Sequence, residues 1–411
     1  MPNITPDIEA FARIKVLGVG GSGGNAVNHM ISNKVKGVDF IAINTDSQDL
    51  HRSLAKKRIH IGKNITRGLG TGMNPDLGRR SVEESKDELQ EAVKGADMVF
   101  VAGGLGGGTG SGASPQVART AKELGCLTVA VVTKPFYFEG RQRVRIAEAA
   151  LEDLRKEVDA IIVIPNDKLL SSISRETTVK NAFAVCDEIL RQAVEGISDL
   201  ITTPGIINID FADIRTVMEN AGSALMGIGS ASGENRAIEA AKAAINSPLL
   251  DVSIAGAKGV LFSIAGGEDL TMFEIQDAAK VITESIDPEA KIIFGTVRDE
   301  KLKKNEVKIT VIATGFPEGQ LPTQQKSAPM QSMEQAQATE PSILSFMKGG
   351  GTNEKGKIFH PVPEPRKERE PMTSEKITDV KKDRDAKVPP PANDDDDWGA
   401  IPAFLRRSRL K

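Results

Sequence analysis

The chain has 411 residues and a nearly balanced charge, with 53 Lys and Arg against 56 Asp and Glu. This length predicts two or three structural units, and the charge balance excludes the strong basic field on which general nucleic-acid binding depends. No apolar run approaches the roughly 20 residues of a membrane-spanning helix, and residues 1–10 lack the pattern of a signal peptide. We therefore expect a cytosolic chain without direct membrane insertion. Cys126 and Cys186 are too few for a disulfide framework or a metal cluster, and we expect both in the core.

The N-terminal part alternates short β-branched runs with longer amphipathic stretches, after a flexible N-terminus at residues 1–12. The alternation is typical of a Rossmann-type parallel sheet that carries helices on both faces, which we assign to one α/β domain at residues 13–177. The five expected strands are at residues 14–17, 38–43, 98–102, 128–132 and 160–164.

A long helix follows this domain. Apolar residues recur in steps of three and four from Val179 to Leu200, until Pro204 and Gly205 end the pattern. The pattern predicts a central helix at residues 178–203, about 25 residues and therefore about 38 Å long. A coiled-coil seam is the alternative, but additional apolar residues widen the face beyond a two-helix seam. We therefore expect the helix to lie between two domains.

Residues 204–316 predict a smaller α/β domain, with helices at 236–246 and 271–285 and strands at 260–265, 292–298 and 307–313. Beyond it the composition changes to Gln, Pro, Ser, Lys and Glu with few large apolar residues. Such a segment cannot bury enough surface to offset its chain entropy, so we expect a disordered linker at residues 317–393.

The last segment, residues 394–411, combines an acidic run, an apolar stretch and a basic finish. Large apolar residues at the end of a disordered segment are typical of a short docking peptide, with a frayed terminus as the alternative. The residues expected to bind a partner are Trp398, Ile401, Pro402, Phe404 and Leu405.

Two glycine clusters each follow a strand-like run and precede a helical pattern. The first contains Gly-x-Gly-x-x-Gly at positions 18, 20 and 23, a pattern that is typical of dinucleotide-binding turns. On that hypothesis the chain would be a nicotinamide-dependent oxidoreductase, and Asp46 could be the acidic residue that binds the ribose. The second, residues 104–112, opens another helix whose free amides and dipole favour negative charge. Two such segments facing one ligand suit a triphosphate better than a dinucleotide. The chain has no Walker-type phosphate motif.

These motifs carry a specific resemblance. They are Gly106-Gly-Gly-Thr-Gly-Ser-Gly112, Asn44-Thr-Asp46, Val132-Thr-Lys-Pro-Phe136, Asn208-Ile-Asp-Phe-Ala-Asp213 and the terminal Ile-Pro-Ala-Phe-Leu. Together they resemble the bacterial FtsZ family, tubulin-like GTPases of the cell-division ring, from about residue 13 to residue 316 and again in the tail. The resemblance implies a tubulin-like fold, GTP and GDP as nucleotides, and Mg²⁺ held mainly by phosphate oxygens without a dedicated protein metal site. Ser22 departs from the glycine that the family commonly has.

The resemblance also implies a nucleotide site, in which Asp187 would accept both N1–H and N2–H of guanine, a pair that adenine cannot supply. The alternative for Phe183 and Asp187 is a core Phe and a solvated Asp. Glu139 and Arg143, four residues apart, are expected on one helix face near the ribose, with an exposed salt bridge as the alternative. The full set is Gly20, Gly21, Ser22, Gly23, Gly24, Asn25, Asn44, Thr45, Asp46, Gly106, Gly107, Gly108, Thr109, Gly110, Pro135, Glu139, Arg143, Asn166, Phe183 and Asp187.

The catalytic residues implied by the resemblance are Asn208, Asp210 and Asp213. Two carboxylates three residues apart at a helix start also suit simple capping, which remains the alternative. The loop belongs to the second domain, at the far end of the central helix from the glycine clusters. In the resembled family these acids enter the nucleotide site of the next subunit and help position the attacking water. Repeated head to tail, such a heterologous contact makes a filament.

The sequence therefore favours a self-assembling GTPase of the bacterial cell-division ring, cytoplasmic and placed at the division site. Its partners would be further copies of itself and, through the tail, membrane-tethering division proteins such as FtsA. A tubulin-like GTPase for plasmid or chromosome partition would share the same core, and the tail favours division. The oxidoreductase hypothesis offers no role for the second glycine cluster or for the acidic loop.

Overall fold

A computed structural model describes residues 12–170, 174, 176–247, 250, 254–299 and 302–316. The expectations for the N-terminus up to residue 11, the linker at 317–393 and the tail at 394–411 lie outside the described residues, and with them Trp398, Ile401, Pro402, Phe404 and Leu405.

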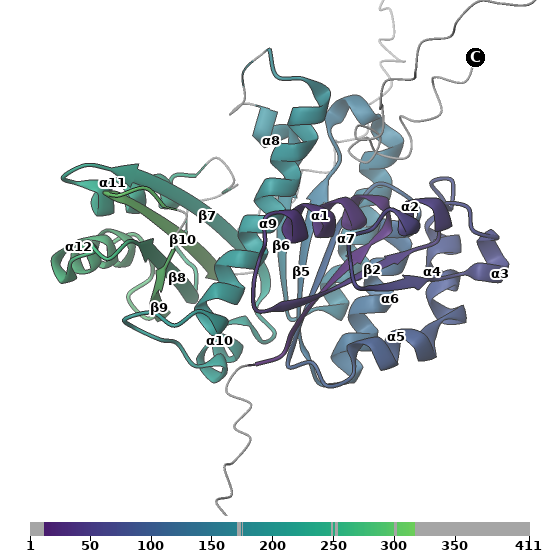
Figure 1. The fold of residues 1–411 in the computed structure, drawn as a ribbon, viewed down its shortest axis with the longest axis horizontal. Coiled ribbons are helices and arrows are strands. Elements are labelled where there is room, and N and C mark those ends of the chain that lie inside the picture. The colour runs from purple at the N-terminus through teal and green to yellow at the C-terminus, as the bar shows by residue number, and fades with distance from the viewer. Residues whose placement is uncertain are drawn as a thin grey trace, which may run out of the picture. The chain divides into compact units, whose positions relative to one another are not determined.

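Ten strands form one sheet in the order β3-β2-β1-β4-β5-β6-β7-β10-β8-β9 among the described residues (Figure 1). The pairings from β3 through β6 to the start of β7 are parallel, β10 is antiparallel to both of its neighbours, and β8 and β9 are parallel. The strands are β1 Ile14–Val19, β2 Val38–Asn44, β3 Lys57–His60, β4 Met98–Gly104, β5 Leu127–Lys134, β6 Ala160–Pro165, β7 Gly222–Ser232, β8 Gly259–Gly266, β9 Lys291–Arg298 and β10 Glu306–Thr314.

Helices follow most strands, as the alternating pattern predicts, and the long central helix is confirmed as α9. Figure 1 shows α9 between the β1–β6 strands and the β7–β10 strands. The helices are α1 Gly20–Ser32, α2 Ser47–His51, α3 Lys63–Thr66, α4 Pro75–Glu84, α5 Lys86–Val93, α6 Thr109–Glu123, the 3₁₀ turn η1 Tyr137–Glu139, α7 Arg141–Glu157, α8 Asn166–Leu170, α9 Val179–Thr202, α10 Phe211–Met218, α11 Arg236–Ile245 and α12 Met272–Thr283.

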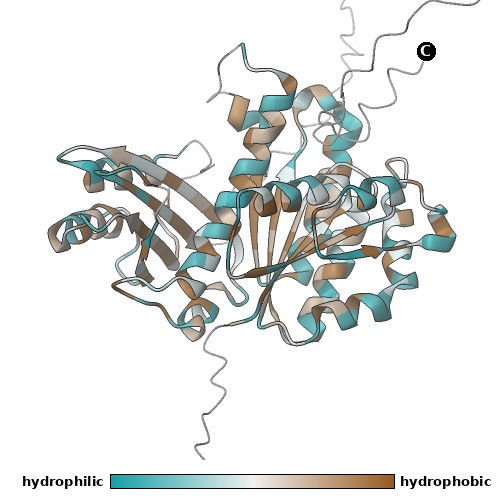
Figure 2. Cartoon of the chain, viewed as in Figure 1, coloured by the Kyte–Doolittle hydropathy of each residue, from teal (hydrophilic) through white to brown (hydrophobic). Residues whose placement is uncertain are grey.

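Three apolar cores hold these layers together, and the strands supply their side chains with the expected period of two. Within β4, Phe100 faces a core shared with α1, α9 and α10, whereas Val99 and Val101 face a core shared with α4–α7. The third core lies between α11, α12 and the strands β8 and β10. Figure 2 shows the same pattern, with hydrophobic colour concentrated on the strands. Cys126 and Cys186 are both buried, as expected.

Strand β7 joins the two sets of strands, and it was not predicted. Its first residues pair in parallel with β6, Gly222 opposite Ala160, and its remainder pairs antiparallel with β10. The segment is rich in Gly, Ser and Ala and lacks the β-branched run by which the other strands were found.

The strand directions define two edges for the functional residues. We call the edge at which β1, β4, β5 and β6 end the carboxyl edge, and the edge at which they begin the amino edge. Because ligands of open parallel sheets bind outside the carboxyl ends of the strands, we expect a binding site at the carboxyl edge. Among the helices of the described residues, none is both long enough and apolar enough to span a bilayer.

Candidate active site

Two glycine-rich segments meet at the carboxyl edge, each at the start of a helix. Residues 20–25, the first segment, form the opening turn of α1 directly after β1, so the loop expected there is a helical turn instead. Residues 104–110, the second segment, run from the end of β4 into α6. A Cβ on Gly20, whose φ is +74°, would lie 2.9 Å from the Gly110 nitrogen, so the segments are in contact. The unpaired first N–H groups of both helices therefore open at one place.

A third glycine-rich segment lies against the second. Residues 67–74 precede α4, and Thr71 Oγ1 lies 3.3 Å from Thr109 Oγ1 at the start of α6. A Cβ on Gly108 would come within 2.1 Å of Thr71 Oγ1, so this contact requires glycine. The third segment was missed from the sequence, although its alternation Gly68-Leu-Gly-Thr-Gly72 was a usable signal.

Polar side chains tie these segments to the end of β2. Thr45 Oγ1 lies 2.8 Å from Thr109 Oγ1, and both residues are buried. The Asn44 side chain accepts the Thr45 N–H at 2.8 Å and donates to Asp49 at 3.0 Å, which fixes the turn after the strand. Asp46 Oδ1 accepts two N–H groups at the start of α2, so one of its carboxylate oxygens is engaged in helix capping.

The space beside these segments suits a polar ligand. A Cβ on Gly24 or on Gly107 would meet no atom within 4 Å, and a small pocket beside Gly24 is lined by Asn25 and Asp49 among others. Asn166, at the end of β6, is buried, and its Oδ1 has no hydrogen-bond partner among the described residues. Exposed backbone next to open space, together with a buried acceptor, fits a ligand that brings both phosphate oxygens and hydrogen-bond donors.

Glu139 and Arg143 form a largely buried pair rather than an exposed salt bridge. Glu139 ends η1, before α7 begins, so the prediction that both lie on one helix is wrong. Their side chains are 7% and 14% exposed, with 3.8 Å between Arg143 NH1 and Glu139 Oε2. Burial raises the pKa of Glu139, against the opposing effects of the Phe136 N–H and Arg143. The pair lies beside the second glycine segment, because a Cβ on Gly106 would lie 3.0 Å from the Arg143 carbonyl oxygen and 3.1 Å from Pro135.

Phe183 and Asp187 lie one turn apart near the start of α9. The Phe183 ring packs edge-on against Phe136, with 5.3 Å between the ring centroids, at the margin of the core. No hydrogen bond or ion pair joins the Asp187 side chain to the other described residues. Asp187 is partly exposed, and burial of its carboxyl group raises its pKa to about 7. A partner that donates hydrogen bonds to this carboxylate would offset the cost of its burial.

Asn208, Asp210 and Asp213 lie at the amino edge, around the turn from α9 into α10. The Asn208 side chain accepts a backbone N–H from three residues earlier at 2.8 Å. Asp210 Oδ1 caps α10 by accepting an N–H of its first turn at 3.1 Å. Two hydrogen bonds between Ile207 and Thr296 hold the loop against β9. Asp210 and Asp213 are nevertheless exposed, so capping engages one oxygen and leaves the acidic loop open to solvent.

The structure does not bring the acidic loop to the glycine segments. The chain leaves the carboxyl edge after β6, and α10 delivers it to the start of β7, which pairs with the start of β6 at Gly222 and Ala160. Helix α9 makes this crossing with 24 residues, about 36 Å at 1.5 Å per residue. Figure 1 shows α10 at the opposite end of α9 from α8.

Family models and solved structures show which family the chain belongs to. A model of the GTPase domain of the Tubulin/FtsZ family matches residues 13–174, and a model of the C-terminal domain of the FtsZ family matches residues 222–317. An empty FtsZ dimer from M. jannaschii is 46% identical, over 74% of this chain and 88% of its own, with a TM-score of 0.71. The chain belongs to the Tubulin/FtsZ family.

Two further structures are similar. A tryptophan-to-tyrosine variant of M. jannaschii FtsZ is also 46% identical, over 75% of this chain and 92% of its own, with a TM-score of 0.72. CetZ2 from Haloferax volcanii, solved as a GTPγS-bound protofilament, is 22% identical over 75% of this chain and 95% of its own, with a TM-score of 0.65. This second likeness shows the shared fold alone.

Membership in the Tubulin/FtsZ family identifies the chain as a GTPase of that family, which binds GTP and GDP, and confirms the predicted tubulin-like α/β fold. It also weighs against the nicotinamide-dependent oxidoreductase. Ser22, which stands where the family commonly has glycine, is accommodated by the end of β4, because a Cβ on Gly104 would lie 2.4 Å from Ser22 Oγ. The hydroxyl of Ser22 thus occupies the space that glycine leaves at position 104.

Proposed function

We propose that this chain is a self-assembling GTPase whose active site forms between two copies. The glycine segments of one copy would face the acidic loop of the next. The observation that carries this proposal is the separation of the two halves by α9, about 36 Å long. An acid at the amino edge is too distant to orient water at a nucleotide bound at the carboxyl edge of its own chain.

The nucleotide is proposed to lie along the carboxyl edge. The first N–H groups of α1 and α6 bind its phosphates, and the third glycine segment closes over them. Glu139 and Arg143 lie toward the ribose, and Asp187 accepts the two guanine donors. Mg²⁺ bound mainly by phosphate oxygens would neutralise part of their charge; within the described ranges no group of three or more His, Cys, Asp or Glu side chains is arranged to hold a metal.

Hydrolysis then needs only an oriented water molecule. Asp210 and Asp213 of the neighbouring copy accept hydrogen bonds from the water, so that its oxygen faces the γ-phosphorus. The new P–O bond forms as the bond from the γ-phosphorus to the β–γ bridging oxygen breaks, which yields GDP and phosphate. Loss of the γ-phosphate would remove the contacts that it makes with the neighbouring copy and so weaken the contact between copies.

Exposed apolar side chains adjoin both halves of this proposed site. Tyr137 and Phe138, next to Glu139, are 70% and 63% exposed, and Ile206, two residues before Asn208, is 77% exposed. Large apolar side chains at such exposure suit a surface that another molecule covers. Their position beside the two catalytic halves supports a head-to-tail contact, which repeats into a filament because it is heterologous.

We further propose that these filaments form the bacterial cell-division ring, in the cytoplasm at the division site, with the tail docking membrane-tethering proteins such as FtsA. The match of residues 222–317 to the FtsZ C-terminal model supports division over a tubulin-like partition role.

A mixing experiment tests the shared site. Asp210→Ala keeps its nucleotide site but lacks the acid, and we expect GTP turnover to fall by about 100-fold or more while GDP affinity is unchanged. Gly107→Asp places a negative charge beside the phosphates, and its Cβ would meet no protein atom within 4 Å. This variant should therefore fail to bind nucleotide but keep its acidic loop. In the mixture, intact sites meet intact acids, and GTP turnover should partly return.

Glu219→Ala is the matched control, because it removes an exposed acid just after α10, outside the proposed site. It should keep wild-type turnover. A silent mixture, together with wild-type turnover per chain that does not depend on protein concentration, would contradict the shared site.

A further inference from the structure

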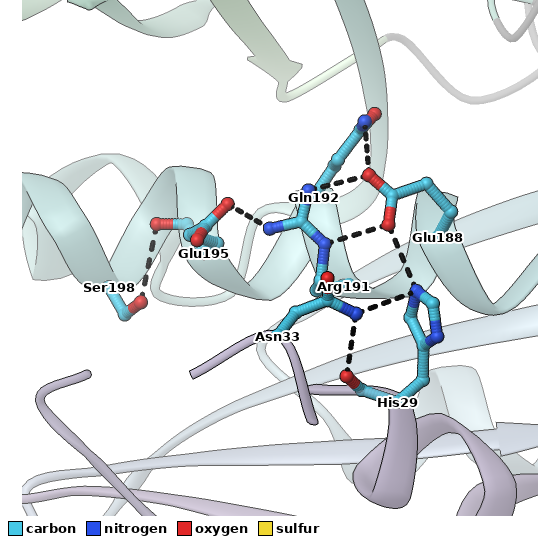
Figure 3. Close-up of polar contacts among 7 residues, drawn as sticks. All are labelled: His29, Asn33, Glu188, Arg191, Gln192, Glu195 and Ser198. Atoms are coloured by element: carbon cyan, nitrogen blue, oxygen red, sulfur yellow. Dashed lines mark hydrogen bonds and ion pairs between the residues drawn. The ribbon is translucent and has the colours of Figure 1, made fainter. Parts of the chain in front are cut away.

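A network of polar side chains joins α1 to α9 (Figure 3). It includes none of the residues that are proposed to bind nucleotide or to orient water. The joining contact is between His29 Nε2 on α1 and Glu188 Oε2 on α9, at 3.0 Å. We call this network the α1–α9 cluster, and its members are His29, Asn33, Glu188, Arg191, Gln192 and Glu195.

Glu188 is the centre of the α1–α9 cluster. Arg191 donates to both of its carboxylate oxygens, from Nε at 2.8 Å and from NH2 at 2.5 Å, and Gln192 donates at 2.7 Å. Arg191 also pairs with Glu195, one turn further along α9. Burial would raise the pKa of Glu188, but the hydrogen bonds from Arg191 and His29 outweigh it and hold this pKa at about 2. Glu188 is therefore a fixed carboxylate with one orientation on the helix.

The imidazole of His29 can make only one of its two contacts at Nε2. Asn33 Nδ2 lies 3.2 Å from Nε2 and could donate only to an unprotonated nitrogen, whereas Glu188 requires an N–H there. Asn33 has another acceptor, because its Nδ2 lies 2.9 Å from the His29 carbonyl oxygen. The arrangement in which Nε2–H donates to Glu188 thus satisfies all three side chains.

This contact joins the two helices that carry the two ends of the proposed nucleotide site. Helix α1 begins with the first glycine segment, and Asp187 directly precedes Glu188 on α9. Successive helix residues are about 100° apart, so holding Glu188 fixes the direction in which Asp187 projects. A turn of α9 by about 10° would move an atom about 6 Å from its axis by about 1 Å. Displacements of that size can cost up to about 100-fold in a site that depends on orientation.

We propose that the His29–Glu188 contact is a positioning contact that sets Asp187 relative to the phosphate-binding start of α1, and so determines selectivity for guanine. His29 and Glu188 act through Asp187 and touch no nucleotide themselves. The inference rests on the proposed role of Asp187 in binding guanine.

The test compares two diphosphates, GDP and inosine diphosphate, which lacks the 2-amino group but keeps N1–H. In the wild-type chain the additional hydrogen bond to a carboxylate should favour GDP by roughly 10- to 100-fold. In His29→Ala, a displaced Asp187 pairs poorly with two donors at once, and this ratio should fall by about three- to tenfold. Equilibrium competition with a fluorescent guanine nucleotide on the full chain measures both affinities.

Three further variants complete the design. His29→Gln offers an amide N–H close to the position of Nε2–H and should restore most of the ratio. Glu188→Ala breaks the contact from the other side and should lower the ratio even if His29→Ala fails to fold. Arg119→Gln removes an interhelical ion pair with Glu157, from α6 to α7, and should leave the ratio unchanged.

A merely structural role for the α1–α9 cluster would weaken GDP and inosine diphosphate equally. An unchanged ratio in His29→Ala and Glu188→Ala, with the wild-type preference intact, would overturn the positioning contact alone. A wild-type chain that binds both diphosphates equally would overturn the role of Asp187 as well.

Discussion

The carboxyl edge and the amino edge of this sheet are built in different ways. At the carboxyl edge, buried threonines and closely packed glycines hold the backbone segments in contact, as at Thr45, Thr71 and Thr109. At the amino edge, the acidic loop has few internal bonds, and Asp210 and Asp213 are exposed. The difference follows from the chemistry proposed for each. Binding phosphate with N–H groups requires preorganised backbone, whereas orienting water requires carboxylates that another surface can cover.

The contrast also explains the placement of charge. Asp187 is a carboxyl group whose burial raises its pKa, whereas the carboxylates of the acidic loop remain in solvent. A partly buried carboxyl group with no partner among the described residues costs stability until a ligand supplies hydrogen bonds, and an exposed group costs little in the free chain. On the proposed function, nucleotide specificity is set within one chain at the carboxyl edge, and the amino edge contributes to catalysis only where two chains meet.

The largest expected effect is the loss of GDP affinity when a charge is placed in the open space at the carboxyl edge. In Gly107→Asp, a carboxylate about 4 Å from phosphate costs about 4 kcal/mol at an effective dielectric constant of 20, or about a thousandfold in affinity. The melting temperature of the nucleotide-free chain should stay close to that of the wild type, since a Cβ there meets nothing within 4 Å. Calorimetry of GDP binding and thermal unfolding measure the two quantities.

Gly108→Ala is the contrasting control. Its Cβ would lie 2.1 Å from Thr71 Oγ1 and 2.7 Å from the Asn74 nitrogen, so even a methyl group forces the second and third segments apart. We expect a loss of about 1–3 kcal/mol in the free energy of unfolding before any nucleotide is added. If Gly107→Asp lost the same stability, the space beside Gly107 would belong to the protein and not to a ligand.

The next largest effect concerns guanine. Asp187→Ala removes the acceptor of two donors and should weaken GDP binding by roughly 5- to 150-fold, corresponding to about 1–3 kcal/mol for an unpaired polar edge. We expect ADP to bind the wild-type chain weakly, and its binding should change much less. Wild-type chains that bind ADP as tightly as GDP would contradict this role.

A smaller effect follows from the raised pKa of Asp187. The proposed guanine contact requires the carboxylate form, so bound nucleotide should lower a pKa that is about 7 in the free chain. GDP affinity should be steady above that pKa and fall on acidification, by on the order of tenfold from pH 8 to pH 6. Asp187→Asn has no proton to lose, so its weaker affinity should lack this dependence. A wild-type affinity that is constant over the same range would exclude the buried carboxyl as the guanine acceptor.

Sequence patterns predicted the elements whose physics is local. The apolar periodicity from Val179 to Leu200 is a property of the helix itself, and α9 lies within one residue of the predicted bounds at each end. Five parallel strands were found because buried strands are rich in β-branched residues, whereas the short parallel strand β3, with the sequence Lys-Arg-Ile-His, was missed. Strand β7 was missed because its Gly, Ser and Ala residues are placed by pairing with β6 and β10, which no local pattern encodes.

The candidate site shows the same division. Glycine clusters at strand ends predicted the first two segments. That Gly108 packs on Thr71 is a tertiary contact, and so the third segment went unassigned. The spacing of Glu139 and Arg143 suggested one helix, but the glycine at position 140, with φ +101°, separates η1 from α7. Spacing alone could not show this break.

The smallest expected effect lies outside both edges. A chain that ends at Asn393 should hydrolyse GTP within about twofold of the full chain at the same concentration, because every residue proposed to bind nucleotide or orient water lies before residue 214. Both halves of the proposed site would thus be retained.

The tail itself is proposed to recruit partners, and Trp398, the only tryptophan, reports on it directly. Its emission should shift when a membrane-tethering division protein binds the full chain, and it should be absent from the truncated one. Turnover that collapses on truncation, while GDP affinity is kept, would place the tail in the contact between copies. The tail would then be a third region of the active site, because the acidic loop would not complete that site alone.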